Sequence, residues 1–224
     1  KWMLSANGTI FTYEYEAIIP GLLKRWYEER QEMQRKMREC GDNEIEREYW
    51  DKRQLVKKIN LNSLYGAILN PGCRFFDIRI GQSVTLTGRC ITKHMASKVN
   101  EIVTGEYDHK GESIVYGDTD SVYFSAYKTL QKEIKDGLIP WTKDSVVGLY
   151  DKISEEVNSS FKSFMTKAFH TPATRGEVIA AGRELVASKG LFITKKRYAL
   201  LYYDKEGKRT DVDGKEGKMK AMGL

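Results

Sequence analysis

The stretch SIVYGDTDSVYFSA, residues 113–126, decides the fold and raises the first question of chemistry. Apolar residues run from 114 to 116 and again from 122 to 124, and each run is typical of a short strand. The residues between them, Gly-Asp-Thr-Asp, are typical of a tight turn. We therefore predict a β-hairpin whose tip carries two aspartates, Asp118 and Asp120.

Two carboxylates this close together need a reason, because like charges repel unless a cation lies between them. A hard divalent ion such as Mg²⁺ would remove that cost, since it prefers oxygen ligands. Thr119 and Ser121 are small and leave room for a substrate backbone. The competing interpretation is an ordinary turn, in which the aspartate side chains accept hydrogen bonds from turn amides. The hairpin alone leaves both interpretations open.

Composition restricts the classes of protein that fit. The 224 residues are 41% hydrophobic, which is enough for one or two hydrophobic cores. The net charge of +6 is compatible with a polyanionic partner but does not require one. Three widely spaced cysteines argue against a disulfide framework or a zinc site, and for a reducing compartment. No apolar run reaches the length of a membrane span.

Hydrophobic spacing outside the hairpin predicts a mixed fold. Two long helices joined by the turn CGDNE form a predicted helical hairpin over 20–66, which Pro20 opens. Further helices are expected over 80–104 and 145–169. Strands are expected in three further segments: near 8–16, at the start of GEVIAAGRELVASKG (176–190), and on either side of the EGK turn in 195–214. A mainly helical first part followed by mixed segments predicts an α+β fold.

A second constellation lies in KKINLNSLYGA, residues 57–67, on the second of these helices. Lys58, Asn62 and Tyr65 recur at helical spacing and share one face, just before Gly66. Such a face offers a nucleotide an ammonium group for phosphate, an amide and an aromatic ring. Taken singly, these residues are explained more simply as a solvated lysine, a capping asparagine and a core tyrosine. Their occurrence together on one face favours a binding role.

Two further groups of cations extend the pattern. Arg30 lies near the middle of the first helix, and antiparallel pairing of the helices would let it face Lys58. A guanidinium there could bind phosphate through two hydrogen bonds. The basic run 195–197 enters a predicted strand before Tyr198, so alternate charges would point to opposite faces. One face could follow a phosphate backbone, although generic surface charge is the alternative for this run.

Together these pieces resemble the family B DNA polymerases. YGDTDS (116–121) is similar to the palm motif of that family, which carries metal-binding aspartates. KKINLNSLYG is similar to its fingers motif, Lys-x-x-x-Asn-Ser-Leu-Tyr-Gly, and KKRY (195–198) resembles the downstream motif that contacts the primer–template duplex. Within that family, the surrounding sequence segments, including KVNE and SKG, are most similar to the T-even-type bacteriophage replicative polymerases. The resemblance spans nearly all of residues 8–224.

The resemblance implies an antiparallel palm sheet with packed helices and a protruding antiparallel helical hairpin, the fingers. In that division residues 1–19 form a palm-side lead-in strand segment, 20–66 form the fingers, and 67–224 form the palm with its catalytic hairpin at 113–126. The chain starts at Lys1 and both ends fall inside patterned sequence. We therefore expect a piece of a longer polymerase.

The resemblance also implies a role for each candidate residue. Asp120 is expected to bind the catalytic metal ions, with Asp118 beside it as a second catalytic and metal-binding residue. The incoming nucleotide is expected to contact five residues: Arg30, Lys58, Asn62, Tyr65 and Gly66. The DNA is expected to contact another five: Thr119, Lys195, Lys196, Arg197 and Tyr198. Glu177 is expected to be an accessory carboxylate, on a looser alignment.

The implied reaction is template-directed addition of dNMP to a primer 3′-hydroxyl by a DNA-directed DNA polymerase. The implied cofactor is a pair of Mg²⁺ ions, with Mn²⁺ as the alternative ion. Expected partners are primer–template DNA, dNTP, the remainder of the polymerase in the same chain or as a split subunit, and a sliding clamp. No membrane partner is expected. The expected location is the cytoplasm, which for a phage gene is that of the infected bacterium.

Departures from the family pattern keep other hypotheses open. The 224 residues contain neither the earlier palm motif, Asp-x-x-Ser-Leu-Tyr-Pro-Ser, nor a proofreading exonuclease segment, so we expect the chain alone to be incomplete. The main alternative is a non-catalytic nucleic-acid-binding remnant of the polymerase scaffold, which explains the charge but not the adjacency of Asp118 and Asp120. A further alternative is another two-metal palm enzyme, such as an RNA-directed polymerase.

Overall fold

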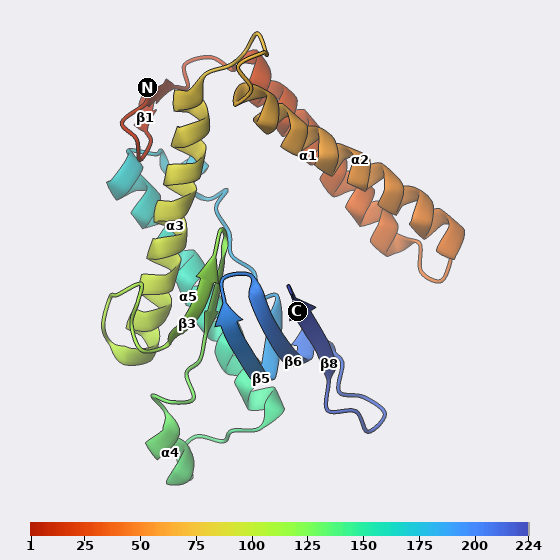
Figure 1. The fold of residues 1–224 in the computed structure, drawn as a ribbon, viewed down its shortest axis with the longest axis vertical. Coiled ribbons are helices and arrows are strands. Elements are labelled where there is room, and N and C mark those ends of the chain that lie inside the picture. Colours follow the sequence, from red (N-terminus) through yellow and green to blue (C-terminus); the bar gives the residue numbers. More distant parts are fainter. Residues whose placement is uncertain (224) are drawn as a thin grey trace. The chain divides into compact units, whose positions relative to one another are not determined.

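The computed structural model describes residues 1–223, which form helices and antiparallel strands and confirm the predicted α+β class (Figure 1). The chain divides into two compact units, Lys1–Leu86 and Thr87–Leu224. The boundary falls inside helix α3 (Ile78–Thr104). Leu224, the last residue of the predicted palm segment, lies outside the described residues. No helix within residues 1–223 combines the length and the apolar character needed to cross a membrane.

The first unit contains a small hairpin and two long helices. Strands β1 (Trp2–Leu4) and β2 (Ile10–Thr12) pair antiparallel. Helices α1 (Ile18–Glu39) and α2 (Glu44–Ile68) then lie along each other (Figure 1). The two helices that the sequence predicts are present, and the pair extends slightly beyond 20–66 at both ends.

Local signals explain where these helices begin and end. Pro20 lies in the first turn of α1, where its missing N–H has no helical partner to lose. Gly41 adopts a φ of 54° in the connecting turn, a conformation that glycine reaches without steric cost. The side chain of Asn43 then caps α2 by accepting a hydrogen bond from the Glu46 N–H at 3.2 Å. Along its described residues α1 buries no side chain, so this hairpin is solvated over most of its surface.

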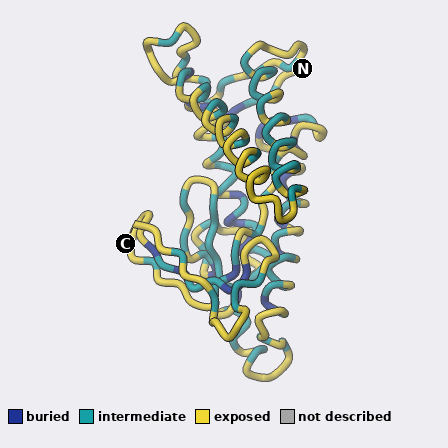
Figure 2. The backbone as a smooth tube through the Cα atoms, turned by 90° about the vertical axis from the view of Figure 1, so that its right-hand side faces the viewer, coloured by how far each residue is buried: buried dark blue, intermediate teal, exposed yellow. Residues whose placement is uncertain are grey.

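The core of the second unit lies between α3 and α5 (Lys143–Phe169). Buried residues of α5 recur at helical spacing and form one face: Val146, Ile153, Val157, Phe161, Met165 and Phe169. Val157 and Phe161 meet Val99 of α3, and each of these three side chains is at most 4% exposed. Buried residues are dark blue in Figure 2, whereas the α1–α2 hairpin is almost entirely yellow and teal.

A hairpin of β3 (Ile114–Asp118) and β4 (Ser121–Phe124) packs against this core. Ile114 and Phe124, at the base of the hairpin, contact the α3–α5 cluster. The short helices α4 (Gln131–Lys135) and α6 (Ala173–Gly176) precede and follow α5. The hairpin predicted at 113–126 is therefore present, with a half-buried base that packs on the core and with Thr119 and Asp120 exposed at its tip.

A separate antiparallel sheet completes the second unit. Strand β6 (Arg197–Lys205) lies between β5 (Leu185–Thr194) and β8 (Lys218–Met222), and the short β7 (Lys208–Arg209) pairs with the end of β6. Arg183 forms ion pairs with Asp151 of α5 and with Asp204 of β6, whose side chain is 2% exposed. This partly buried bridge ties the sheet to α5.

The strand predicted at the start of 176–190 is wrong. Residues 177–184 have no regular strand, and β5 begins only at Leu185. The side chain of Asn158 on α5 bonds both the N–H and the C=O of Ala181, each at 2.7 Å. The backbone of this segment therefore pairs with a helix side chain instead of a neighbouring strand.

One buried asparagine sets the path of the chain into β3. Asn100 of α3 is 0% exposed. Its Oδ1 accepts hydrogen bonds from the N–H and the hydroxyl of Ser113, at 3.2 and 2.8 Å, and its Nδ2 donates to the Glu106 carbonyl at 2.8 Å. A Cβ at Gly111 would lie 2.0 Å from this amide, so only glycine fits there. The loop that precedes the hairpin is thus fixed to α3.

His94 makes the stability of the second unit depend on pH. Its ring is 8% exposed, bonds the Tyr107 hydroxyl at 2.7 Å and the Ser160 hydroxyl at 2.9 Å, and stacks on Phe164. Burial, with a smaller contribution from Lys98, lowers the pKa of His94 below its usual 6.5. Below that pH the unfolded chain binds the proton more readily than the folded one does. The free energy of unfolding is therefore expected to decrease as the pH is lowered below 6.5.

Urea unfolding at pH 7.5 and pH 5.5 measures this effect. We expect the wild-type protein to lose stability at the lower pH, and His94→Gln, which cannot take up a proton, to lose less. An equal loss in the two proteins would assign the pH dependence to other groups.

Candidate functional site

The acidic turn, residues 118–120, is held at the tip of the β3–β4 hairpin. Asp118 pairs with Ser121, which leaves Thr119 and Asp120 as a two-residue loop. Thr119 has a φ of 53°, which is unusual for a β-branched residue. The hydroxyl of Thr92 on α3 donates to the Thr119 carbonyl at 3.0 Å and helps to hold this conformation. Strain of this kind persists where surrounding contacts fix it, and it is frequent at functional sites.

The two carboxylates of the acidic turn differ in their surroundings. Asp118 is half-buried and accepts a hydrogen bond from the Thr119 hydroxyl at 3.2 Å. Asp120 is exposed and has no hydrogen-bond or ion-pair partner among residues 1–223. Both offer the oxygen ligands that Mg²⁺ and Mn²⁺ prefer. Within the described chain no three His, Cys, Asp or Glu side chains could share one ion, so this pair would supply part of a ligand set.

The basic turn, residues 195–197, closes the β5–β6 hairpin. Thr194 pairs with Arg197, so Lys195 and Lys196 form a two-residue loop, and Lys196 has a φ of 61°. The expectation that all three cations alternate along a strand is therefore wrong, because only Arg197 belongs to β6. All three side chains are exposed. A turn of this kind gathers the charges at one end of the sheet.

The aromatic cluster joins these two turns. It consists of Tyr116 and Tyr123 from the first hairpin and Phe192 and Tyr198 from the second, and every pair of rings has its centroids between 5.4 and 5.8 Å apart. The hydroxyls of Tyr123 and Tyr198 bond at 3.0 Å, and the Lys196 N–H donates to the Tyr116 hydroxyl at 2.8 Å. Burial, followed by the Tyr198 hydroxyl, raises the pKa of Tyr123 well above its usual 10.

The cluster changes the interpretation of Tyr198. Its side chain is only 6% exposed and its hydroxyl is taken up by Tyr123. These contacts favour a role in positioning the basic turn over direct contact with DNA.

The predicted nucleotide-binding face of the helical hairpin has two exposed residues on α2. Lys58 and Asn62 lie on the surface of α2. Arg30 of α1 is half-buried and its Nε donates to Gln54 at 3.2 Å. Gln54 lies one turn before Lys58 on the same side of α2, so the helix pairing brings Arg30 to this face as expected. The neighbouring Lys57 instead pairs with Glu29 at 2.5 Å.

Tyr65 and Gly66 lie at the end of the same helix. The Tyr65 hydroxyl donates to the Gly81 carbonyl at 3.1 Å, which fixes the end of α2 to the first turns of α3. At Gly66 a Cβ would meet no heavy atom of residues 1–223 within 4 Å beyond the neighbouring backbone of its own helix. The chain therefore leaves open space at Gly66.

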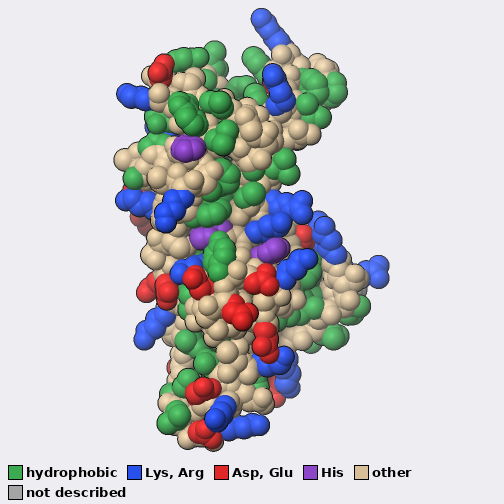
Figure 3. Space-filling view, turned by 90° about the vertical axis from the view of Figure 1, so that its left-hand side faces the viewer, with side chains coloured by type: hydrophobic (Ala, Val, Ile, Leu, Met, Phe, Trp, Pro, Cys, Tyr) green, Lys and Arg blue, Asp and Glu red, His purple; other side chains and the backbone are tan. Residues whose placement is uncertain are grey.

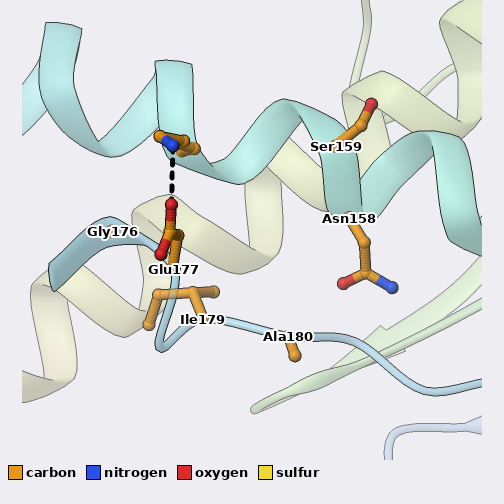
Figure 4. Close-up of a pocket in the computed structure, with 7 residues that line it drawn as sticks. Asn158, Ser159, Gly176, Glu177, Ile179 and Ala180 are labelled. Carbon is orange, nitrogen blue, oxygen red and sulfur yellow. Dashed lines mark hydrogen bonds and ion pairs between the residues drawn. The ribbon is translucent and has the colours of Figure 1, made fainter. Parts of the chain in front are cut away.

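Glu177 lies elsewhere in the second unit, at a shallow cavity of about 320 Å³ between α5 and residues 176–180 (Figure 4). Its carboxylate pairs with Lys162 of α5 at 2.6 Å. The Asn158 and Ser159 side chains complete the polar part of the lining. Its role as an accessory carboxylate stays a prediction, and Lys162 already neutralises its charge.

Surface charge alone does not mark a nucleic-acid interface. On the face shown in Figure 3, acidic and basic side chains lie interspersed. Many cations of the helical hairpin are paired along their own helix, as Arg35 is with Glu32 and Glu39. The candidate interface rests on the local basic turn and not on the net charge of +6.

Sequence reasoning did not single out four residues that make these contacts: Thr92, Tyr116, Tyr123 and Phe192. An aromatic residue stands close to each turn, in VYGDTDSVYF and LFITKKRY, and that repetition is the signal that could have revealed the cluster. The Thr92 hydroxyl has no such signal, because its partner is a backbone carbonyl 27 residues away.

Comparison with known proteins gives a consistent set of relatives. The model of a family described as DNA polymerase family B matches residues 4–221. A DNA-directed DNA polymerase of Escherichia phage RB69 is 34% identical over 183 residues, 76% of this chain and 19% of that relative. DNA polymerase 1 of Pyrococcus abyssi (strain GE5 / Orsay) is 28% identical over 201 residues, 90% of this chain and 21% of that relative.

A solved structure resembles the whole chain. The family B DNA polymerase from the hyperthermophilic archaeon Pyrobaculum calidifontis has a TM-score of 0.51 and 20% identity, over 100% of this chain and 22% of its own. This likeness concerns the fold. The chain spans about a fifth of the length of these relatives.

Proposed function

Because this chain belongs to DNA polymerase family B, we propose that it forms part of an enzyme that adds dNMP to a primer 3′-hydroxyl under the direction of a template. The observation that carries the proposal is the aromatic cluster, which joins the acidic turn to the basic turn within one unit. One turn offers oxygen ligands for divalent cations, and the other offers cations for phosphates. Polymerisation needs both next to each other.

Asp118 and Asp120 are proposed to bind the catalytic Mg²⁺ ions. Bound Mg²⁺, or Mn²⁺ in its place, would activate the 3′-hydroxyl and stabilise the departing pyrophosphate. The hairpin contributes by holding one half-buried and one exposed carboxylate on a base that packs against the α3–α5 core, so little reorganisation is needed. Thr119, between them, is proposed to lie near the primer terminus.

The helix face of α1 and α2 is proposed to bind the incoming dNTP. Arg30 and Lys58 would bind the triphosphate, since a guanidinium and an ammonium are its natural partners. Asn62 is exposed on the same face and would contact the nucleotide. Tyr65 would line the nascent base pair, and the open space at Gly66 supports this role.

The basic turn is proposed to bind the primer strand. Lys195, Lys196 and Arg197 would contact its phosphates, which gives affinity without sequence preference. Tyr198, which is buried, would hold the basic turn in place through its packing in the aromatic cluster. The remainder of the polymerase, in the same chain or as a separate subunit, and a sliding clamp are proposed as protein partners. The proposed location is the cytoplasm, which for a phage gene is that of the infected bacterium.

Replacing Gly66 by Ala separates helix stability from nucleotide binding. Because a Cβ there would clash with none of the described residues, Gly66→Ala should stabilise the protein by about 0.5–1 kcal/mol through its higher helix propensity. If the space serves the nascent base pair, primer extension should fall at the same time. Thermal unfolding and extension of a labelled primer measure the two effects. A stabilised variant with unchanged extension would remove Gly66 from the site.

Primer extension tests the proposed function. The chain is assayed with labelled primer–template, dNTP and Mg²⁺, with and without a second polypeptide that carries the Asp-x-x-Ser-Leu-Tyr-Pro-Ser segment. We expect template-dependent extension only when that polypeptide is present. Robust extension by residues 1–224 alone would refute the expected incompleteness. Metal-independent DNA binding without extension in either mixture would favour a non-catalytic remnant of the scaffold.

A further inference from the structure

We infer that Tyr116 is a positioning residue that fixes the basic turn in register with the acidic turn. The inference rests on the proposed function and adds a residue to it. The hydroxyl of Tyr116 accepts the backbone N–H of Lys196 at 2.8 Å, across 80 residues of sequence. This bond links strand β3, two residues before the acidic turn, directly to the tip of the β5–β6 hairpin.

The direction of the Tyr116 side chain matters. Residues two apart on a strand point to the same face, and Tyr116 and Asp118 are two apart on β3. Both are half-buried, whereas Val115 and Gly117 between and beside them are exposed. The basic turn is therefore held on the face of the hairpin that carries the Asp118 carboxylate.

The basic turn needs such support. Lys196 has a φ of 61°, which costs free energy for any residue that is not glycine. Its side chain is exposed, so no burial of its own compensates that cost. A hydrogen bond from its N–H to a fixed acceptor favours this conformation over others of the loop.

The acceptor is fixed because the Tyr116 ring is packed. It contacts Tyr123, Phe192 and Tyr198 at centroid distances of 5.4 to 5.8 Å. The Tyr116 side chain therefore keeps the two turns at a constant distance, and we call this its spacer role. A primer phosphate bound by Lys195–Arg197 would then lie at a constant offset from the acidic turn, as positioning of a reacting hydroxyl requires.

The chain offers a matched pair of variants. Tyr116→Phe removes the hydroxyl that accepts the Lys196 N–H and keeps the ring in the cluster. Tyr123→Phe also removes one hydroxyl from the same cluster, but its lost partner is Tyr198. A purely structural role of the cluster predicts equal effects, whereas the spacer role predicts an effect of Tyr116→Phe alone.

Two measurements on the full 224-residue chain separate these cases. Fluorescence anisotropy gives the Kd for primer–template DNA, and we expect Tyr116→Phe to raise it about fivefold and Tyr123→Phe less than twofold. Photo-crosslinking with 5-iodo-deoxyuridine at single primer positions reports register. The wild-type protein and Tyr123→Phe should crosslink at one position, and Tyr116→Phe at several. Equal results for the two variants in both measurements would overturn the inference.

A third protein distinguishes failure of this inference from failure of the proposed function. Replacing Lys195, Lys196 and Arg197 together by Ala should weaken DNA binding and flatten its salt dependence. If that triple variant binds like the wild-type protein, the basic turn is not a DNA site and both proposals fail. If it binds weakly while Tyr116→Phe matches the wild-type protein in affinity and register, only the spacer role fails.

Hydrogen exchange tests the bond without relying on a variant. The Lys196 amide lies in an exposed loop, yet the bond to Tyr116 should slow its exchange at least tenfold relative to an unstructured peptide. Exchange at the unprotected rate in the wild-type protein would overturn the inference, even if Tyr116→Phe failed to fold.

Discussion

Replacing Asp120 by Asn is expected to lower metal-dependent primer extension by about three orders of magnitude or more. The substitution keeps the size of the side chain and removes its negative charge, so the oxygen that remains is a much weaker ligand for a hard cation. Because Asp120 is exposed and has no partner among residues 1–223, folding should not change. Extension is measured in the presence of the polypeptide that carries the earlier palm motif.

Metal binding by the chain itself gives a second readout. Calorimetric titration with Mn²⁺ should show at least a tenfold loss of affinity in Asp120→Asn. Asp136→Asn is the matched control, since Asp136 is an exposed aspartate of the same unit that follows α4 and lies outside the proposed site. If both variants bind Mn²⁺ like the wild-type protein, the acidic turn is an ordinary turn and the catalytic proposal fails.

Asn100→Ala is expected to destabilise the second unit by about 3–5 kcal/mol. The substitution removes three hydrogen bonds of a side chain that is 0% exposed. It also leaves the Ser113 hydroxyl, in a residue that is 1% exposed, without its acceptor, and an unsatisfied buried polar group adds to the cost. The loop into β3 should loosen, and the acidic turn with it.

Urea unfolding measures this loss, with Glu101→Ala as the control. Glu101 follows Asn100 on the same helix, but its side chain is 40% exposed and its ion pair is with the partly exposed Lys98. Its removal should change the free energy of unfolding by less than about 1 kcal/mol. A loss below that level in Asn100→Ala would show that the loop is held by other contacts.

Elements governed by local patterns could be predicted from the sequence. The apolar runs around the acidic turn predict its two strands. The helical spacing of Val157 and Phe161 predicts the buried face of α5. The Arg30 position followed from antiparallel pairing of two helices with a short turn. In these cases neighbours in sequence decide the structure.

Elements governed by distant contacts could not be predicted. Residues 177–184 are apolar enough for a strand, but Asn158 satisfies the backbone at Ala181 instead. The basic run looked like the start of a strand, although a two-residue loop interrupts it after Thr194. Tyr198 looked like a contact for DNA, and only the fold shows that three other rings surround it.

The left-handed backbone at Lys196 has a consequence for its mutational tolerance. The conformation favours glycine or asparagine, whereas the proposed contact with phosphate favours a cation. No amino acid meets both demands at once, and arginine is the exchange that keeps the cation. A saturation library at this codon, sorted for DNA binding, should therefore retain Lys and Arg and discard Gly, although glycine relaxes the loop.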